Sequence, residues 1–172
     1  MNPHAVVKET VNMSVGEGDP APEFSARSHD GRTVTLADFR GRILVLFFYP
    51  RDNTPVCTRE ACGFRDSNDE LRSLGAVVIG VSSSSADSHK GFIEKHALPY
   101  TLLADEGGAL RNAFGAPRTL GFLPGRVTYV IDREGIVRMV LSAQFSALRH
   151  VQKALDKVKE ISSSGETPEP EA

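Results

Sequence analysis

The chain has 172 residues, which is enough for one domain with its own hydrophobic core. Hydrophobic residues make up 40% and charged residues 24%, as is ordinary for a soluble globular protein. The formal net charge is -2 with acidic and basic residues interspersed, so we expect no nucleic acid as a partner and no membrane-binding surface.

The two ends differ in composition from the rest of the chain. Residues 1–14 lack periodicity, and residues 161–172 are polar and rich in Pro, Glu and Ser. We therefore expect a flexible N-terminal tail, one domain over 15–160 and a disordered C-terminal tail.

No secretory signal pattern is visible, so we expect a cytoplasmic protein. A reducing cytoplasm disfavours a structural disulfide, so the close spacing of the two cysteines needs a chemical explanation.

Strand and helix signals alternate from the start of the domain. Gly31 marks a turn into a short strand, and a helical turn is expected over 36–39. An unbroken apolar and aromatic run over 43–49 predicts a central strand that is covered on both faces. A helical stretch follows over about 56–74 and ends at Gly75.

The second half continues the alternation. A second buried strand is predicted over 76–81 and a helix over about 86–96, preceded by serines that can cap it. Two runs over 127–131 and 136–141 predict a hairpin, and a last amphipathic helix is expected over about 146–160. This order predicts an α/β protein with the thioredoxin fold, in which helices flank a central mixed β-sheet on both faces.

The most informative segment leads from the central strand into the first long helix. Cys57 lies in the first turn of that helix, where free backbone N–H groups and the helix dipole stabilise a thiolate. Thr54 lies three residues earlier, and Arg126 directly precedes a predicted strand, where its cation can face the same loop. Pro50 and Thr54 are equally typical of an ordinary strand-to-helix turn, and the sequence leaves both interpretations open.

The helical period separates the two cysteines. Cys57 shares one stripe with Ala61, Phe64 and Leu71, whereas Cys62 falls among charged residues, so we expect a half-buried Cys57 and an exposed Cys62. In an intact helix their Cα atoms lie about 8.6 Å apart. A disulfide tolerates no more than about 7 Å. The two sulfurs can therefore bond only if the start of the helix unwinds, which favours a switch over a permanent disulfide.

A family resemblance follows from this segment. The pattern Pro50-x-x-x-Thr54-x-x-Cys57 resembles the active-site signature of the peroxiredoxins. The longer run over 48–62 is similar to their Q-type branch, also called bacterioferritin comigratory proteins. The similarity extends from 18–22 through 125–132 to the last predicted helix.

The resemblance implies a thiol-specific peroxidase that reduces hydrogen peroxide and organic hydroperoxides to water and alcohols in antioxidant defence. Cys57 is then the peroxidatic cysteine that becomes a sulfenic acid, Thr54 and Arg126 orient the peroxide, and Pro50 shields the site. Cys62 is the resolving cysteine, and thioredoxin or a similar dithiol reductant reduces the resulting intramolecular disulfide. No cofactor and no metal are implied. We expect a monomer or a weak homodimer.

One departure and two alternatives remain. Val56 stands where Q-type proteins usually have Gly, and a β-branched residue stiffens the turn that must unwind. An external thiol could instead resolve the sulfenic acid, or the chain could be a non-catalytic redox sensor. A disulfide reductase or isomerase is disfavoured, because such proteins need Cys-x-x-Cys.

Three further residues have competing interpretations. Glu60, one turn from Cys57, either steers Arg126 or is a first-turn acid favoured by the helix dipole, and the sequence alone favours the second. His89 and His96 share a predicted helix face, where packing is favoured over metal binding. The spacing of the two cysteines is also poor for zinc.

Overall fold

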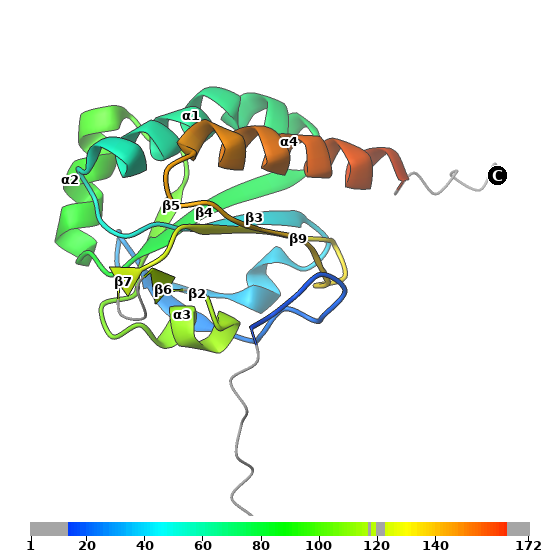
Figure 1. Ribbon diagram of the computed structural model, residues 1–172, viewed down its shortest axis with the longest axis horizontal. Helices are drawn as coiled ribbons and strands as arrows, with labels where there is room; N and C mark the ends of the chain where they lie inside the picture. The colour runs from blue at the N-terminus through cyan, green and yellow to red at the C-terminus, as the bar shows by residue number, and fades with distance from the viewer. Residues whose placement is uncertain (1–13, 117, 120–122, 165–172) are drawn as a thin grey trace, which may run out of the picture.

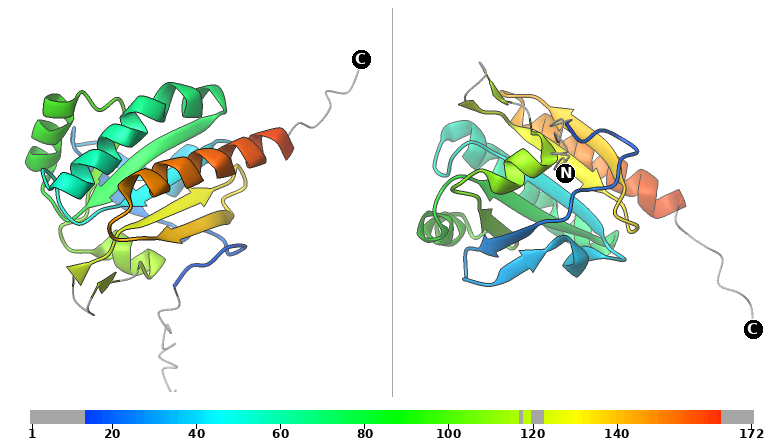
Figure 2. Two further views of the ribbon diagram at one scale, coloured as in Figure 1. Left: turned by 45° about the horizontal axis from the view of Figure 1, so that its top comes forward. Right: turned by 90° about the horizontal axis from the view of Figure 1, so that it is seen from below.

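The computed structural model describes residues 14–116, 118–119 and 123–164. A seven-stranded mixed sheet forms the centre of the molecule, with helices on both faces (Figures 1 and 2). The strand order is β2 (Thr33–Thr35), β1 (Ser25–Ser28), β5 (Thr101–Ala104), β4 (Ala76–Ser82), β3 (Ile43–Phe48), β8 (Val127–Ile131) and β9 (Val137–Ser142). The short strands β6 (Arg118–Thr119) and β7 (Leu123–Pro124) form a separate pair.

The central strand β3 is buried along its whole length and divides the core in two. Residues such as Phe47 face a layer formed by α1 (Pro55–Ser73), α2 (Ala86–His96) and α4 (Ala147–Ser164). Alternate residues such as Phe48 face the other layer, which includes η1 (Leu36–Phe39) and α3 (Ala109–Phe114). Because side chains alternate along a strand, one apolar run supplies both layers.

The pairing of the strands decides where the start of α1, which carries Cys57, lies in the fold. Strands β3, β4 and β5 are parallel, so the segments that follow them leave the sheet at one edge. The antiparallel strand β8 pairs with β3 and therefore begins at that same edge, with Val127 opposite Phe48. The start of α1 and the residue before β8 are thus brought together by the register of the sheet.

Most predicted elements are present within one or two residues of their expected bounds, and α2 has the expected bounds. The sequence did not predict β1, β5, α3 or the β6–β7 pair. The last helix continues to Ser164, so the first four residues of the predicted tail over 161–172 are helical. The rest of that tail and residues 1–13 lie outside the described residues.

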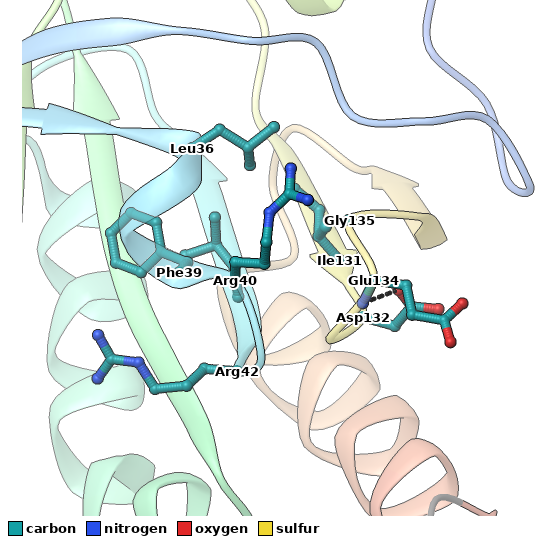
Figure 3. A pocket seen from close by; sticks show the side chains of 9 residues that line it. Leu36, Phe39, Arg40, Arg42, Ile131, Asp132, Glu134 and Gly135 are labelled. Atoms are coloured by element: carbon teal, nitrogen blue, oxygen red, sulfur yellow. Dashed lines mark hydrogen bonds between the residues drawn. The ribbon is translucent and has the colours of Figure 1, made fainter.

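A small cavity of about 20 Å³ lies at the opposite end of the sheet, beside the start of β3 and the end of β8 (Figure 3). Its lining comprises Leu36, Phe39, Arg40, Arg42, Leu44, Ile131, Asp132, Glu134 and Gly135. Neither cysteine lines it, and it has room for little more than a water molecule.

Across the described helices, we find none with the length and apolar character that crossing a bilayer requires.

Candidate active site

The loop between β3 and α1 places Cys57 at a helix start. Thr54 takes the N-cap position with an extended backbone, and Pro55 begins the helix, where its missing N–H is not needed. The side chain of Cys57 is only 1% exposed and packs in the same core cluster as Ala61 and Phe64. The predicted stripe is therefore confirmed, but Cys57 is fully buried rather than half-buried.

The first turn of α1 offers unused donors. Thr58 N–H is the first to bond back along the helix, to the Thr54 carbonyl at 2.9 Å. In the described part of the chain, the N–H groups of Val56 and Cys57 have no hydrogen-bond partner. Together with the helix dipole, these groups favour negative charge at the Cys57 sulfur.

Arg126 supplies a fixed cation at this sulfur. Its Nη2 donates to Cys57 Sγ at 3.3 Å, and its Nη1 donates to Glu60 Oε2 at 3.1 Å. Its Nε donates to the Gln144 carbonyl at 3.0 Å, and its backbone N–H donates to Gln144 Oε1 at 3.0 Å. The residue is only 2% exposed. Burial opposes its charge, but Glu60 and Cys57 raise the pKa of Arg126, so the guanidinium stays ionised.

Thr54 and Pro50 flank the same turn, and in the described part of the chain no hydrogen bond joins either of them to the sulfur. Thr54 Oγ1 donates to the Arg51 carbonyl at 3.1 Å, and no bond joins it to Cys57. Because its proton is committed to that carbonyl, its lone pairs are left to accept a hydrogen bond from a substrate. Pro50 is partly buried at the end of the strand. The structure thus brings Arg126 into contact with Cys57. Thr54 and Pro50 lie in the loop that leads into the same helix.

Cys62 lies in the same unbroken helix and forms no disulfide with Cys57. It is partly buried, not exposed as the sequence suggested. On one side of it, the buried Tyr100 hydroxyl donates to the Ala61 carbonyl at 2.6 Å. On the other side, a Cβ at Gly63 would lie only 2.8 Å from Val151 Cγ2, so only glycine lets α1 approach α4 this closely. Both neighbours of Cys62 are therefore held in place.

Glu60 is the residue whose role the sequence misjudged. It is 0% exposed and pairs with Arg126, so the interpretation as a simple first-turn acid is wrong. Its second oxygen, Oε1, is buried with no hydrogen-bond partner among the described residues. Burial raises the pKa of Glu60 from 4.5 to about 8, although Arg126 acts in the opposite direction. A carboxyl that holds its proton near neutral pH leaves the charge of Arg126 available to Cys57.

This pKa predicts a measurable pH effect on stability. Between the unfolded value of 4.5 and the folded value of about 8, the folded chain holds a proton that the unfolded chain has lost. The contribution of Glu60 is therefore full at low pH and is lost as the pH rises toward 8, by at most about 1.4 kcal/mol per pH unit. We expect Glu60→Gln to flatten this decline in urea midpoints measured between about pH 6 and pH 9.

The control for that experiment lies on the exposed side of the same helix. Glu70 is half-exposed and pairs with Lys159, so Glu70→Gln should leave the slope of stability against pH as in the wild type. Parallel profiles for the wild type and Glu60→Gln would show that Glu60 does not titrate in this range.

Further polar residues hold the loop that carries Gln144, whose carbonyl and side chain bond to Arg126. The buried His150 donates from Nε2 to the Ala143 carbonyl at 2.7 Å and accepts from the Thr128 hydroxyl at Nδ1, at 2.8 Å. Burial lowers the pKa of His150, consistent with a neutral ring. The bond from His150 fixes Ala143, the loop residue next to Gln144. None of these contacts was predicted, because they join β8, the loop after β9 and α4.

Comparisons with known proteins identify the family of the chain. The model of the AhpC/TSA family matches residues 17–140. The chloroplastic peroxiredoxin Q of Suaeda salsa is 46% identical over 149 residues, which cover 86% of this chain and 70% of the relative. That of Sedum lineare is 42% identical over 155 residues, covering 90% and 83%.

Solved structures give the same result. Peroxidoxin BcpB from Mycobacterium tuberculosis superposes with a TM-score of 0.79 at 34% identity, covering 86% of this chain and 98% of that one. Peroxiredoxin Q from Xanthomonas campestris gives 0.75 at 28% identity, covering 81% and 91%. The predicted thioredoxin fold is therefore confirmed.

The comparisons also correct one expectation. The cytoplasmic location expected from the sequence is wrong, because the similar curated proteins, including those of Suaeda salsa, Populus jackii and Arabidopsis thaliana, are chloroplastic. A short N-terminal pattern was too weak a basis for that expectation.

The family match spans most of the described domain, and the relatives from Suaeda salsa and Sedum lineare are covered over 70% and 83% of their length. The fold that positions Cys57 and Arg126 is thus shared with a solved peroxiredoxin Q structure. The chain belongs to the AhpC/TSA family and is a peroxiredoxin of the Q type, a thiol peroxidase.

Proposed function

We propose that Cys57 is the peroxidatic cysteine of this enzyme and that Cys62 resolves its oxidised form. The Cys57 thiolate attacks one oxygen of the hydroperoxide, an S–O bond forms, and the O–O bond breaks. The leaving oxygen takes a proton and departs as water or an alcohol, and Cys57 is left as a sulfenic acid. The observation that carries this proposal is the bond from Arg126 Nη2 to Cys57 Sγ at 3.3 Å.

The surrounding groups fit the charge that develops in this step. A guanidinium held by Glu60 and Gln144 needs no rearrangement to stabilise the departing oxygen. The N–H groups of Val56 and Cys57 add donors at the helix start. Thr54 Oγ1 is placed to accept the hydroxyl proton of a bound hydroperoxide, because its own proton is directed to the Arg51 carbonyl. We assign Pro50 the role of shielding this pocket.

Resolution requires the start of α1 to unwind. The Cys62 thiol attacks the sulfenic sulfur, a disulfide forms, and water leaves. Tyr100 and Val151 hold the residues on both sides of Cys62, so we expect Cys57 to move toward Cys62 rather than the reverse. A dithiol reductant such as thioredoxin then takes up the oxidising equivalents as its own disulfide.

Organic hydroperoxides are proposed as substrates beside hydrogen peroxide. The bacterioferritin comigratory protein of Xanthomonas campestris, which superposes with a TM-score of 0.73 at 28% identity, is known for its alkyl peroxide reduction activity. A monomer or a weak homodimer remains our prediction for the oligomeric state.

Stopped-flow kinetics and mass spectrometry test the proposal. The reduced protein should react with hydrogen peroxide far faster than free cysteine at the same pH, because the site adds donors that the free thiol lacks. After one equivalent of peroxide, peptide mapping should show a Cys57–Cys62 disulfide. A rate equal to that of free cysteine would favour the non-catalytic sensor, and a persistent sulfenic acid without a disulfide would favour resolution by an external thiol.

A further inference from the structure

Among the described residues, hydrogen bonds join residues 51–54 of the loop between β3 and α1 to the rest of the protein through Asp52. The preceding residues Tyr49 and Pro50 have bonds of their own, to Val81 and Ser83. Asp52 is buried at the centre of this loop, and its carboxylate and backbone N–H both have partners outside it. Among the described residues, the other members of 51–54 bond only within the loop or to the start of α1. The partners of Asp52 are Ser84 Oγ (3.1 Å, from the Asp52 N–H), Tyr49 OH (2.6 Å), Ser88 Oγ (2.9 Å) and His89 Nδ1 (2.7 Å).

His89 has an acceptor at each ring nitrogen. Its Nε2 lies 3.0 Å from the Leu103 carbonyl, which can only accept, so this nitrogen carries a hydrogen. Its Nδ1 lies 2.7 Å from Asp52 Oδ2, and its one other hydrogen-bond partner among the described residues is the Tyr49 hydroxyl at 3.4 Å. Because that hydroxyl donates to Asp52 Oδ1 at 2.6 Å, it does not supply a proton to the ring.

The charges around the pair point to an ionised carboxylate. Burial alone would raise the pKa of Asp52, but the hydrogen bonds from His89, Tyr49 and Ser88 lower it. Tyr49 stays neutral, because burial raises its pKa well above 10. With Asp52 ionised, the proton between Asp52 and His89 resides on Nδ1, so both ring nitrogens carry hydrogen. The pair is then a carboxylate and an imidazolium, fully buried.

The position of this pair gives it an effect on the active site. Asn53, the next residue, has a left-handed backbone with φ of 62°, and Thr54 then takes the N-cap position of the helix that carries Cys57. A left-handed residue holds its conformation only while its neighbours are fixed. Hydrogen bonds to ionised groups are roughly twice as strong as neutral ones, so the ion pair fixes this turn more firmly than a neutral network could.

We propose that Asp52 and His89 are positioning residues for the peroxide reaction, a buried carboxylate–imidazolium pair that holds Thr54 and the first turn of α1 where Cys57 needs them. This inference rests on the proposed role of Cys57. It concerns how the loop is held before the peroxide arrives, and not the later disulfide step.

The charge state can be tested without any activity. We expect both ring nitrogens of His89 to show the ¹⁵N chemical shifts of an imidazolium in the reduced wild-type protein at about pH 7, where an unperturbed histidine is mostly neutral. In Asp52→Asn, the amide can donate to Nδ1, so the ring should become the neutral Nε2–H tautomer. A neutral His89 ring in the wild type at that pH would overturn the proposal.

Kinetics test the positioning role in a Cys62→Ser background, which leaves Cys57 as the single thiol. We expect Asp52→Asn and His89→Leu to slow oxidation by hydrogen peroxide by about tenfold or more, the effect of one hydrogen bond to a charged group. Alkylation of Cys57 by iodoacetamide needs no Thr54 and should fall by less than about twofold. A general loss of structure would change both reactions together.

The matched control is His96→Ala on the same helix, where the ring contacts Phe92 and not the loop. It should leave both rates as they are in the parent. If the parent itself reacts with peroxide no faster than free cysteine, the proposed function fails. If the parent is fast and both loop variants are equally fast, or lose both reactions in parallel, only the positioning role fails.

Discussion

Replacing Arg126 by alanine is expected to slow the reaction of Cys57 with hydrogen peroxide by about 100- to 1000-fold, the usual loss for a donor that stabilises developing charge. The guanidinium touches Cys57 Sγ at 3.3 Å and is held by Glu60 and Gln144 on its other sides. Water that enters the space left behind must reorganise around the departing oxygen, whereas the fixed cation does not. Stopped-flow measurement under excess peroxide gives the rate constant directly.

The same substitution should cost much less in stability than the burial of the ion pair suggests. A buried carboxylate that loses its partner would normally destabilise a protein by about 3–5 kcal/mol. Glu60 can avoid this penalty by keeping its proton, because burial already raises its pKa to about 8. We therefore expect a modest loss in urea midpoint near neutral pH that grows above pH 8.

Two variants control for charge and for surface effects. Arg126→Lys keeps a positive charge, but an ammonium cannot reach Glu60, Gln144 and Cys57 together as a planar guanidinium does, so it should restore only part of the rate. Arg138→Ala removes a half-exposed arginine of β9 that pairs with Asp132, and it should leave the rate unchanged. If Arg126→Ala lowers the free energy of unfolding by as much as it raises the activation free energy of oxidation, the role of Arg126 is structural.

The sequence predicted those parts of the fold that have long, regular patterns. The apolar run that forms β3 and the 3.6-residue period of α1 are each decided by many residues at once. Strand β5 has only four residues, and α3 has six between Gly108 and Gly115, which both take left-handed backbones. Segments this short contain too few residues for a period to show.

The site was predictable where it is local in the chain and not where it depends on the sheet. Cys57 and Thr54 lie within one turn, and a motif can connect them. The bond between Arg126 and Glu60 spans 66 residues and exists because β8 pairs with β3. The helical period gave the correct face for Cys57, but the depth of both cysteines depends on the helices that cover α1, which one segment cannot reveal.

Replacing Cys62 by serine is expected to separate oxidation from turnover. The first equivalent of peroxide should still oxidise Cys57 at close to the wild-type rate, because Arg126 and Thr54 bond to groups other than Cys62 in the described structure. Turnover with a dithiol reductant should fall to background. The sulfenic acid, with no thiol to attack it, should persist or proceed to sulfinic acid in excess peroxide. Mass spectrometry distinguishes these products, and Ser67→Ala on the same helix is the control.

The helix must open for the disulfide to form, and the structure predicts how far. Phe64 is buried and stacks on Phe47 with ring centroids 4.6 Å apart, while Gly63 is packed against α4, so α1 is anchored from Gly63 onward. We therefore expect oxidation to increase amide hydrogen exchange over 56–60 but not over 64–73 in the wild type, and to leave both unchanged in Cys62→Ser. Val56, as a β-branched residue in the opening turn, should slow this step without changing its extent. Unchanged exchange over 56–60 in the oxidised wild type would show that the two sulfurs do not meet by unwinding, and turnover retained by Cys62→Ser would assign resolution to an external thiol.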